Sequence, residues 1–204
     1  MNIISTRVIR PKDRSSVVLA NVEITFDTGI KLLNMHLFKP RNEEGANYLK
    51  MPTITTQTGV VRGVYNPTSQ EMREKMTKAA EAALAQAVEA GVNDYTAVFE
   101  ELAPEAYRAP KFSNFYIHWF DNDKPVRAFV SLLMDDCIAL NRLAVVRAPD
   151  TQMLAVRIPK HPIQKGRRQV GYYRIQGSAY DQLYSQVIAA YSNRPGPDQD
   201  GQTA

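Results

Sequence analysis

The sequence matches itself when it is shifted by 108 residues, and this internal repeat restricts the fold more than any other feature. A strand-like run extends over residues 20–39 in the first copy and over residues 128–147 in the second. Apolar positions align with apolar positions along both runs, and Asp27 aligns with Asp135. A solenoid requires at least three stacked repeats, so two copies predict a pseudo-twofold pair within one chain.

The match continues beyond these runs and divides the chain. Pro52 and Gly59 recur as Pro159 and Gly166, one residue short of the first offset, and the helix-like stretch that follows returns to the offset of 108. The division predicts two repeated units, an acidic connector with a short helix, and a disordered tail that has nothing to bury. Their ranges are 1–91 for unit 1, 92–111 for the connector, 112–193 for unit 2 and 194–204 for the tail.

Within each copy the apolar spacing changes from two residues to three or four, which indicates antiparallel strands followed by a helix. A capping pattern at residues 68–71 begins the first helix, which ends at Gly91, and Ser178 is predicted to cap the second. In the connector, Asp94 is predicted to cap a short helix over residues 95–102. The predicted class is therefore α+β, with two small antiparallel sheets, each followed by a helix. The predicted strands cover 4–10, 17–27, 30–38, 47–51 and a short strand ending at 65, and then 115–120, 126–135, 138–147 and 153–158.

Charge is distributed unevenly along the chain, whose formal net charge is +4. Residues 1–84 contain 12 Lys and Arg against 8 Asp and Glu, and residues 111–194 contain 12 against 6. Residues 85–110 contain Arg108 alone against five acids. Two basic units with an acidic connector favour a polyanionic partner for the units.

Several classes of function are disfavoured by what the sequence contains. The single cysteine, Cys137, excludes an internal disulfide and is interpreted as a small filler at a strand-to-strand turn. His36, His118 and His161 form no recognisable ligand pair, so no metal is expected. We find no nucleophile elbow and no phosphate-binding glycine loop, and Asp135 is interpreted as closing a turn rather than as a catalytic acid. We expect a protein that is not an enzyme, with no catalytic residue and no cofactor.

The apolar runs are too short to cross a bilayer, and the first residues do not form a signal peptide. The expected location is cytoplasmic, with no membrane partner.

The first copy resembles the SpoVG family (stage V sporulation protein G, septation regulators). The resemblance rests on an ordered series of short motifs over residues 7–84: 24–27, 34–38, Met51-Pro52, Gly59, Arg62, Pro67 and 73–76. The second copy keeps the strands and the Ile158-Pro159 step but lacks the Arg-Glu-Lys signature of residues 73–75.

The resemblance implies a small sheet with a C-terminal helix that dimerises through its sheet, and a regulatory protein that binds nucleic acid without catalysis. This chain resembles a covalent version of that dimer. In the family the arm after Met-Pro and the start of the helix are associated with DNA contact. The matching cations are Arg62, Arg73, Lys75 and Lys78 in the first copy and Lys160, Lys165, Arg167 and Arg168 in the second.

These cations are shared unequally, because the first copy has a neutral arm with a basic helix start and the second has the reverse. The sequence therefore predicts one asymmetric nucleic-acid site centred on the second arm, where Tyr172 and Tyr173 could stack on bases. The structural alternatives are a solvated hairpin tip for this arm and, for the first helix, neutralisation of its cations by Glu71, Glu74 and Glu81. The sequence leaves DNA and RNA equally open.

An aromatic strand at residues 115–120 supports a rival function. Alternation places Phe115, Ile117 and Trp119 on one face and Tyr116, His118 and Phe120 on the other. The strand is expected either to lie at the junction of the two copies or to form an exposed surface for a protein partner. The rival is a protein-interaction module that does not bind nucleic acid. Further self-association of the monomeric pseudo-dimer through an open sheet edge is also left open.

Overall fold

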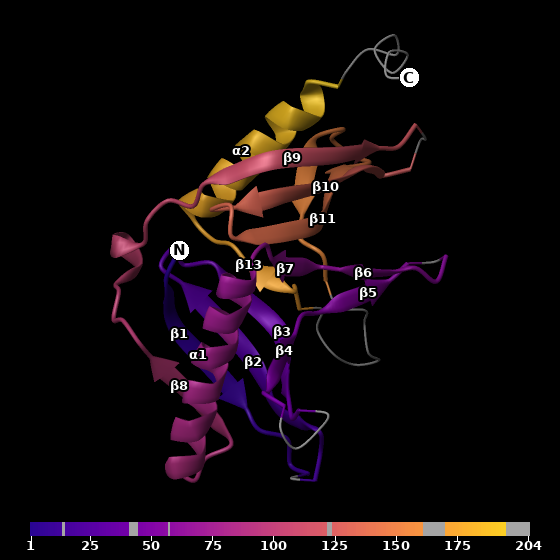
Figure 1. Cartoon of the computed structure of the whole chain (residues 1–204). Helices are drawn as coiled ribbons and strands as arrows, with labels where there is room; N and C mark the ends of the chain where they lie inside the picture. Colours follow the sequence, from indigo (N-terminus) through magenta and orange to yellow (C-terminus); the bar gives the residue numbers. More distant parts are fainter. Residues whose placement is uncertain (14, 41–44, 57, 122–123, 161–169, 195–204) are drawn as a thin grey trace.

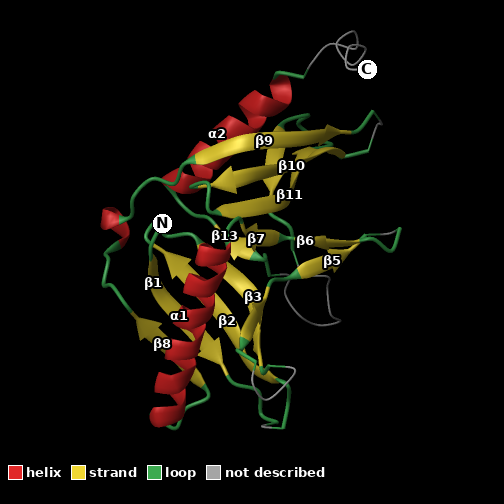
Figure 2. Cartoon of the chain, in the orientation of Figure 1, coloured by secondary structure: helices red, strands yellow, loops and turns green. Residues whose placement is uncertain are grey.

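The computed structural model describes the chain except for residues 14, 41–44, 57, 122–123, 161–169 and 195–204. The protein is α+β and consists mostly of antiparallel strands with two long helices. Figure 1 shows two layered halves, one above the other, each made of a twisted sheet with a helix across one face. Figure 2 shows the same arrangement by secondary structure, with a small hairpin projecting beside the boundary between the halves.

Sheet 1 forms the lower half and has the strand order β13-β3-β2-β1-β8, with β4 also paired to β3. Its residues alternate between buried and partly exposed positions, as expected for a sheet with one covered face. The strands are β1 (Ile3–Ile9), β2 (Val18–Phe26), β3 (Lys31–Phe38), β4 (Tyr48–Lys50), β8 (Asp94–Val98) and β13 (Tyr173–Arg174).

Sheet 2 forms the upper half and has the order β12-β11-β10-β9, with β7 also paired to β11. The two-stranded hairpin β5–β6 stands apart from both sheets. The strands are β5 (Thr53–Thr55), β6 (Val61–Gly63), β7 (Tyr65–Pro67), β9 (Phe112–Trp119), β10 (Val126–Met134), β11 (Ile138–Arg147) and β12 (Leu154–Arg157).

One helix covers each sheet. Helix α1 (Gln70–Glu89) buries a stripe that includes Met72 and Met76 against sheet 1, and Ser69 caps it by accepting a hydrogen bond from the Met72 N–H at 3.1 Å. Helix α2 (Ser178–Ser192) packs on β9 and β12. Its cap differs from the prediction, because Ser178 is the first helical residue and the preceding Gly177 occupies the N-cap position with φ 57°. Neither α1 nor α2 is long and apolar enough to span a membrane.

The two sheets exchange short strands. Strand β7, which precedes α1, pairs with β11 of sheet 2, so that Tyr65 lies opposite Leu140. Strand β13, which precedes α2, pairs with β3 of sheet 1, so that Tyr173 lies opposite Leu32. Tyr65 and Tyr173 are 108 residues apart, and so are Leu32 and Leu140. Each sheet therefore contains a strand that leads into the helix on the other sheet.

Backbone and side-chain contacts reinforce this exchange. The Asn141 N–H donates to the Val64 carbonyl at 2.8 Å, and the Leu33 N–H donates to the Tyr172 carbonyl at 2.9 Å. The rings of Tyr65 and Tyr173 meet edge to face with centroids 6.3 Å apart, and both are buried. Full burial of a large side chain contributes about 1.5–3 kcal/mol, so the exchanged tyrosines add appreciably to the junction. The expectation that the aromatic strand β9 lies at the junction is wrong, since β7 and β13 occupy it.

The connector forms a strand where the sequence predicted a helix over residues 95–102. Residues Asp94–Val98 pair with β1 as β8, and a single 3₁₀ turn follows at Pro104–Ala106. Tyr, Thr and Val within β8 favour extended backbone, and the open edge of β1 supplies hydrogen-bond partners that an isolated helix would lack. Arg7 fixes the register by donating to both carboxylate oxygens of Asp94, at 2.8 and 2.6 Å.

Arg108, the only cation of the connector's acidic stretch, joins the two halves. Its Nε donates to Asp27 at 3.0 Å and its two terminal nitrogens donate to Asp135. The carboxylates are 11% and 9% exposed. Just before it, the Tyr107 ring lies so close over Gly29 that an added Cβ would collide with the ring. Asp27 and Asp135 therefore do more than close their turns, because one guanidinium holds both.

Replacing Arg108 by Gln should lower the free energy of unfolding at pH 7 by about 1–3 kcal/mol, because two nearly buried carboxylates lose their cation. Burial alone would raise the pKa of Asp135, but hydrogen bonds from Arg108 and the Lys111 N–H hold it below its usual value. A lowered carboxylate pKa stabilises the fold above the unfolded-state pKa and ceases to do so as pH falls through the folded-state pKa. The difference between the wild type and Arg108→Gln should therefore shrink below about pH 4 in urea denaturation at stepped pH.

Arg7→Gln serves as the matched control, since it removes a more exposed Arg–Asp pair whose carboxylate is 52% exposed. Arg7→Gln should lower the free energy of unfolding by less than about 1 kcal/mol. Equal losses of stability for the two variants would contradict the role given to Arg108.

Candidate nucleic-acid interface

The face of sheet 2 opposite α2 is cationic and partly exposed. Residues that point toward α2, such as Ala128, Val130 and Val156, are buried, whereas their neighbours on the other side are partly or fully exposed. The four strands β9–β12 contain no Asp or Glu and contain four arginines. We call this surface the outer face of sheet 2. Its residues are Tyr116, His118, Phe120, Arg127, Phe129, Ser131, Arg142, Ala144 and Arg157.

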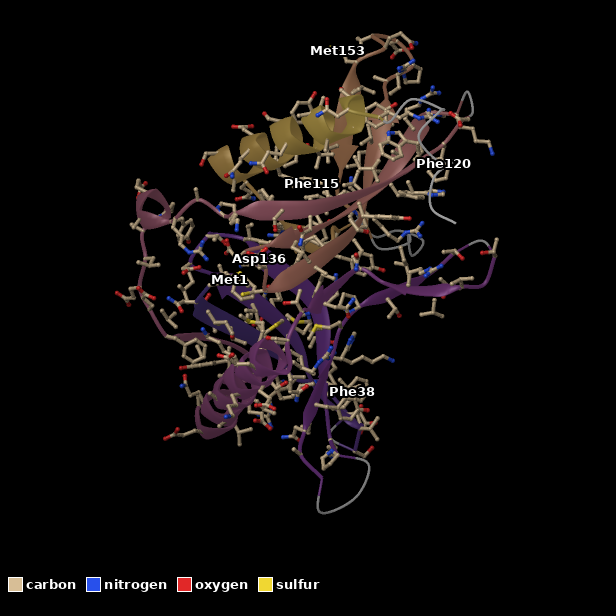
Figure 3. The ribbon with its side chains drawn as sticks, turned by 45° about the horizontal axis from the view of Figure 1, so that its top comes forward. Met1, Phe38, Phe115, Phe120, Asp136 and Met153 are labelled. Carbon is tan, nitrogen blue, oxygen red and sulfur yellow. The ribbon has the colours of Figure 1, made fainter. Side chains whose placement is uncertain are left out.

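Strand register brings an aromatic and cationic row together across this face. His118 pairs with Phe129, Phe129 with Ala144, and Ala144 with Arg157, so the row runs from one edge of the sheet to the other. Phe120 contacts both His118 and Phe129 edge to face, with ring centroids 4.9 and 5.3 Å apart. Figure 3 places Phe120 near the right-hand end of β9, well away from Phe38 of sheet 1. The result is a partly exposed aromatic strip with an arginine at one end.

Arg142 lies over this strip. Its guanidinium carbon is 4.4 Å from the centroid of the Phe129 ring, which is a cation–π contact. Partial burial lowers the pKa of Arg142 below its usual value, and the nearby charge of Arg62 on β6 lowers it further. Two like charges thus lie close together, and among the described residues no carboxylate forms an ion pair with either. Such a pair is stabilised by an anion bound between or beside the two charges.

The backbone at Arg142 is unusual for this residue type. Arg142 has φ 62° and lies beside a bulge where β11 slips against β10. Asn34, 108 residues earlier, has φ 64° at the matching slip between β2 and β3. Asn tolerates the left-handed region well, whereas Arg is strained there by about 1 kcal/mol. The second bulge therefore carries a strained cation in place of a residue that suits the backbone, which is typical of a functional position.

A second cationic group lies at the end of the outer face. Arg127 near the start of β10 and Arg147 at the end of β11 line a cavity of about 310 Å³ together with Lys124, and no acid is among its described lining residues. The buried Nε of Arg147 has no hydrogen-bond partner within the described part of the chain. This cavity extends the cationic surface from Arg142 toward the β9–β10 turn, where the charge of Arg127 helps to lower the pKa of Asp121.

Sheet 1 differs on its corresponding face. There Arg7 is neutralised by Asp94 and by Glu23, the latter at 3.6 Å. Lys50 lies 5.9 Å from the centroid of the Phe38 ring, which stacks on Tyr48, so an aromatic contact is kept but the charges are mixed. The two halves therefore share a sheet-and-helix arrangement but present different electrostatic surfaces.

The predicted second arm is only partly described. Lys160 is exposed and forms an isolated bridge with Gly171, while Lys165, Arg167 and Arg168 lie outside the described residues. The prediction that Tyr172 and Tyr173 stack on bases is wrong, because these residues are only 2% and 1% exposed. Burial also raises the pKa values of both phenols. Their aromatic surface supports the junction between the sheets instead.

The cations at the start of α1 are placed apart from the outer face. Lys78 is exposed and Arg73 is half-buried, while the Lys75 ammonium donates to the Met1 carbonyl at 3.1 Å. No ion pair joins these cations to the helix's own acids in the described structure. Glu74 accepts from Gln70 and Glu81 accepts from Asn47 instead. Arg62 alone of the first copy's predicted cations lies near the outer face.

The remaining predicted features have structural positions of their own. Cys137 is a free thiol that packs partly against the core at the β10–β11 turn. No group of three potential metal ligands occurs among the described residues, and His161 lies outside them. Of the predicted tail, Arg194 is described and binds both carboxylate oxygens of Asp121, and residues 195–204 lie outside the described chain.

Sequence reasoning missed Arg142, Arg157, Arg127 and Phe129. The internal repeat contained a signal for two of them, since Asn34 aligns with Arg142 and Asn21 aligns with Phe129. At these two aligned positions sheet 2 carries a cation and an aromatic ring where sheet 1 carries asparagine. Comparison of the chain with family models, with curated proteins and with solved structures gave no match.

Arg142→Asn should change the free energy of unfolding by less than about 1 kcal/mol, because relief of backbone strain offsets removal of the cation–π interaction. Arg142→Val should instead lower it by more than about 1 kcal/mol, since a β-branched residue is poorly accommodated at this φ. Thermal or urea denaturation of the two variants checks this difference. Equal destabilisation by Asn and Val would show that the guanidinium itself stabilises the fold.

Proposed function

We propose that this protein is a non-enzymatic, nucleic-acid-binding regulator built from two SpoVG-like units in a pseudo-twofold arrangement, and that the outer face of sheet 2 is its binding surface. The observation that carries the proposal is the Arg142 guanidinium over Phe129 beside Arg62, on a sheet whose strands β9–β12 contain no acid. A phosphate between the two guanidinium groups would compensate their repulsion.

The chemistry of this surface favours a single strand over a duplex. Aromatic rings on an open sheet stack on bases only when the bases are unpaired and accessible, whereas arginines alone bind phosphates of either form. His118, Phe120 and Phe129 provide the stacking surface, and Arg62, Arg142 and Arg157 lie around it. Stacking is tolerant of sequence, so we expect weak base specificity.

The exchanged strands support the pseudo-twofold part of the proposal. Adding 108 to the first-copy number and subtracting 108 from the second-copy number converts the pairing of Tyr65 with Leu140 into that of Tyr173 with Leu32. Reciprocal contacts of this kind characterise a twofold interface. On this interpretation, the chain is a covalent dimer in which the first copy retains the family's motifs and the second provides the binding surface.

The second arm belongs to the same proposal. Lys160 follows β12, the strand that contributes Arg157 to the outer face. Lys165, Arg167 and Arg168 follow within eight residues of Lys160 in the sequence. The arm cations would add phosphate contacts to those of Arg62 and Arg142, and so lengthen the bound segment of the strand.

Replacing Arg62, Arg142 and Arg157 by Gln, Asn and Gln should weaken binding to single-stranded DNA or RNA. It should also reduce the slope of log affinity against log salt by about 0.7 for each phosphate that the variant no longer neutralises. Fluorescence anisotropy with single-stranded DNA, single-stranded RNA and duplex DNA at several salt concentrations measures both quantities and ranks the three ligands. Joint neutralisation of Lys160, Lys165, Arg167 and Arg168 should reduce the slope in the same way.

The matched comparison is neutralisation of Arg73, Lys75 and Lys78, which removes the same charge from α1. This variant should bind nearly as well as the wild type, because these cations lie apart from the outer face. An equal or larger loss of affinity in the α1 variant would place the interface on the first unit. Absence of binding to all three ligands by the wild type at low salt would favour the rival protein-interaction module.

Phe129→Leu should weaken binding to single strands while leaving the salt slope unchanged, because it removes a stacking ring without removing charge. The expected loss of binding free energy is about 1–3 kcal/mol if Phe129 contacts a base. Phe38→Leu, at an aromatic position of sheet 1, is the matched control. Unchanged affinity for Phe129→Leu at several salt concentrations would exclude base stacking on this ring.

A further inference from the structure

Strand β9 is an open edge of sheet 2. It pairs with β10 and has no strand on its other side among the described residues. The Phe120 N–H donates to the Arg127 carbonyl at 2.8 Å, so alternate backbone groups of β9 point toward β10. The N–H and C=O groups of Phe115, Ile117 and Trp119 therefore point away from the sheet.

The corresponding edge of sheet 1 is covered. Strand β8 pairs with β1 from Ser5 to Ile9. Backbone hydrogen bonds continue at both ends, where the Arg10 N–H donates to the Asn93 carbonyl at 2.7 Å and the Phe99 N–H donates to the Ile4 carbonyl at 2.8 Å. The same edge of the fold is thus completed by a strand in one unit and left open in the other.

The open edge lacks the charged residues and prolines that usually protect an edge, and its one irregularity is at Asn114 (φ 51°), where the register of β9 against β10 shifts. Edge strands are commonly blocked by charged residues, particularly Lys, or by Pro. Strand β9 has the sequence FSNFYIHW and contains no Lys, Arg, Asp, Glu or Pro. Tyr116 is 70% exposed on this strand. Figure 3 shows β9 running across the molecule between the labelled Phe115 and Phe120.

We propose that β9 pairs antiparallel with β9 of a second copy of this chain, centred on Ile117. In this register Ile117 faces its own symmetry mate and Phe115 faces Trp119 of the second copy. The three residues of each strand whose backbone groups point away from the sheet then supply a ladder of about six hydrogen bonds. A strand that pairs with itself about one residue gives a closed, isologous dimer.

The side chains suit self-pairing on both faces. Phe115, Ile117 and Trp119 pack beneath α2, where the Trp119 Nε1 donates to the Tyr191 carbonyl at 3.4 Å. Across the dimer axis Phe115 would lie opposite Trp119, which continues this apolar layer. On the outer face, Tyr116 would lie opposite His118 and join the two aromatic strips into one surface.

A second copy fits this edge better than a strand of another protein because β9 has no charge that requires a complementary partner. The cross-strand pairs formed with itself are aromatic with aromatic and Tyr with His, and neither pair sets like charges opposite each other. An edge built for a different partner would instead carry features that its own symmetry mate could not match.

The test is sedimentation velocity over a concentration series, without nucleic acid. The wild type should form a dimer, and Tyr116→Lys/His118→Lys should raise its dissociation constant at least about tenfold, because each new lysine faces another across the axis. Tyr116→Glu/His118→Glu should be equally impaired. An equimolar mixture of the lysine and glutamate variants should recover association, since each lysine then faces a glutamate.

Ala82→Lys/Gln86→Lys adds the same charge at two exposed positions of α1 and should leave the dimer unchanged. A wild type that stays monomeric at its highest soluble concentration would overturn the proposal. A dimer that tolerates the lysine pair, or variants that fail to recover association when mixed, would overturn it as well. So would a monomer that uses β9 to pair with a different protein.

Discussion

Each sheet depends on a short strand that leads into the helix covering the other sheet. Strands β7 and β13 contain only three and two residues, yet they hold the buried tyrosines that meet at the junction. Each of these strands directly precedes a helix. Pairing of the strand with one sheet therefore positions the helix that covers the other sheet. Neither half can complete its sheet alone, so we expect the two to fold as one cooperative unit.

The proposed interface uses the differences between the two halves rather than their similarity. The bulges at Asn34 and Arg142 have the same backbone geometry but different side chains. On sheet 1, Arg7 is neutralised by Glu23 and Asp94. On sheet 2, strands β9–β12 contain no acid. In a dimer of identical halves, any change that improved binding would occur in both. In this chain sheet 2 can change for binding while sheet 1 keeps the residues that stabilise the fold.

The sequence predicted the features that depend on local periodicity. Strands β1–β3 and β9–β11 and helix α1 were predicted from alternation and from the capping pattern at residues 68–71, since their burial repeats within a few residues. The residue that caps α1 in the structure is Ser69. Strand β8 was missed because five residues such as Asp94–Val98 take their conformation from the neighbouring edge of β1. The exchange through β7 and β13 could not be predicted, because strands this short are defined by distant partners.

The candidate site was predictable to a similar extent. Arg62 was found through the family resemblance, whereas Arg142 and Phe129 required the strand register. The stacking role given to Tyr172 and Tyr173 was wrong because composition cannot distinguish an aromatic ring at a surface from one at a buried junction.

The position of Arg108 divides the connector into a fixed part and a free part. The Lys111 N–H and C=O both bond to Asp135, Arg108 binds Asp27 and Asp135, and Tyr107 lies over Gly29. On the other side, Phe99 and Glu100 bond to the Ile4 carbonyl. Changes in linker length can therefore be absorbed only between Glu100 and Tyr107. Any insertion closer to β9 would move the guanidinium away from its carboxylates, so related chains should vary in length only in that segment.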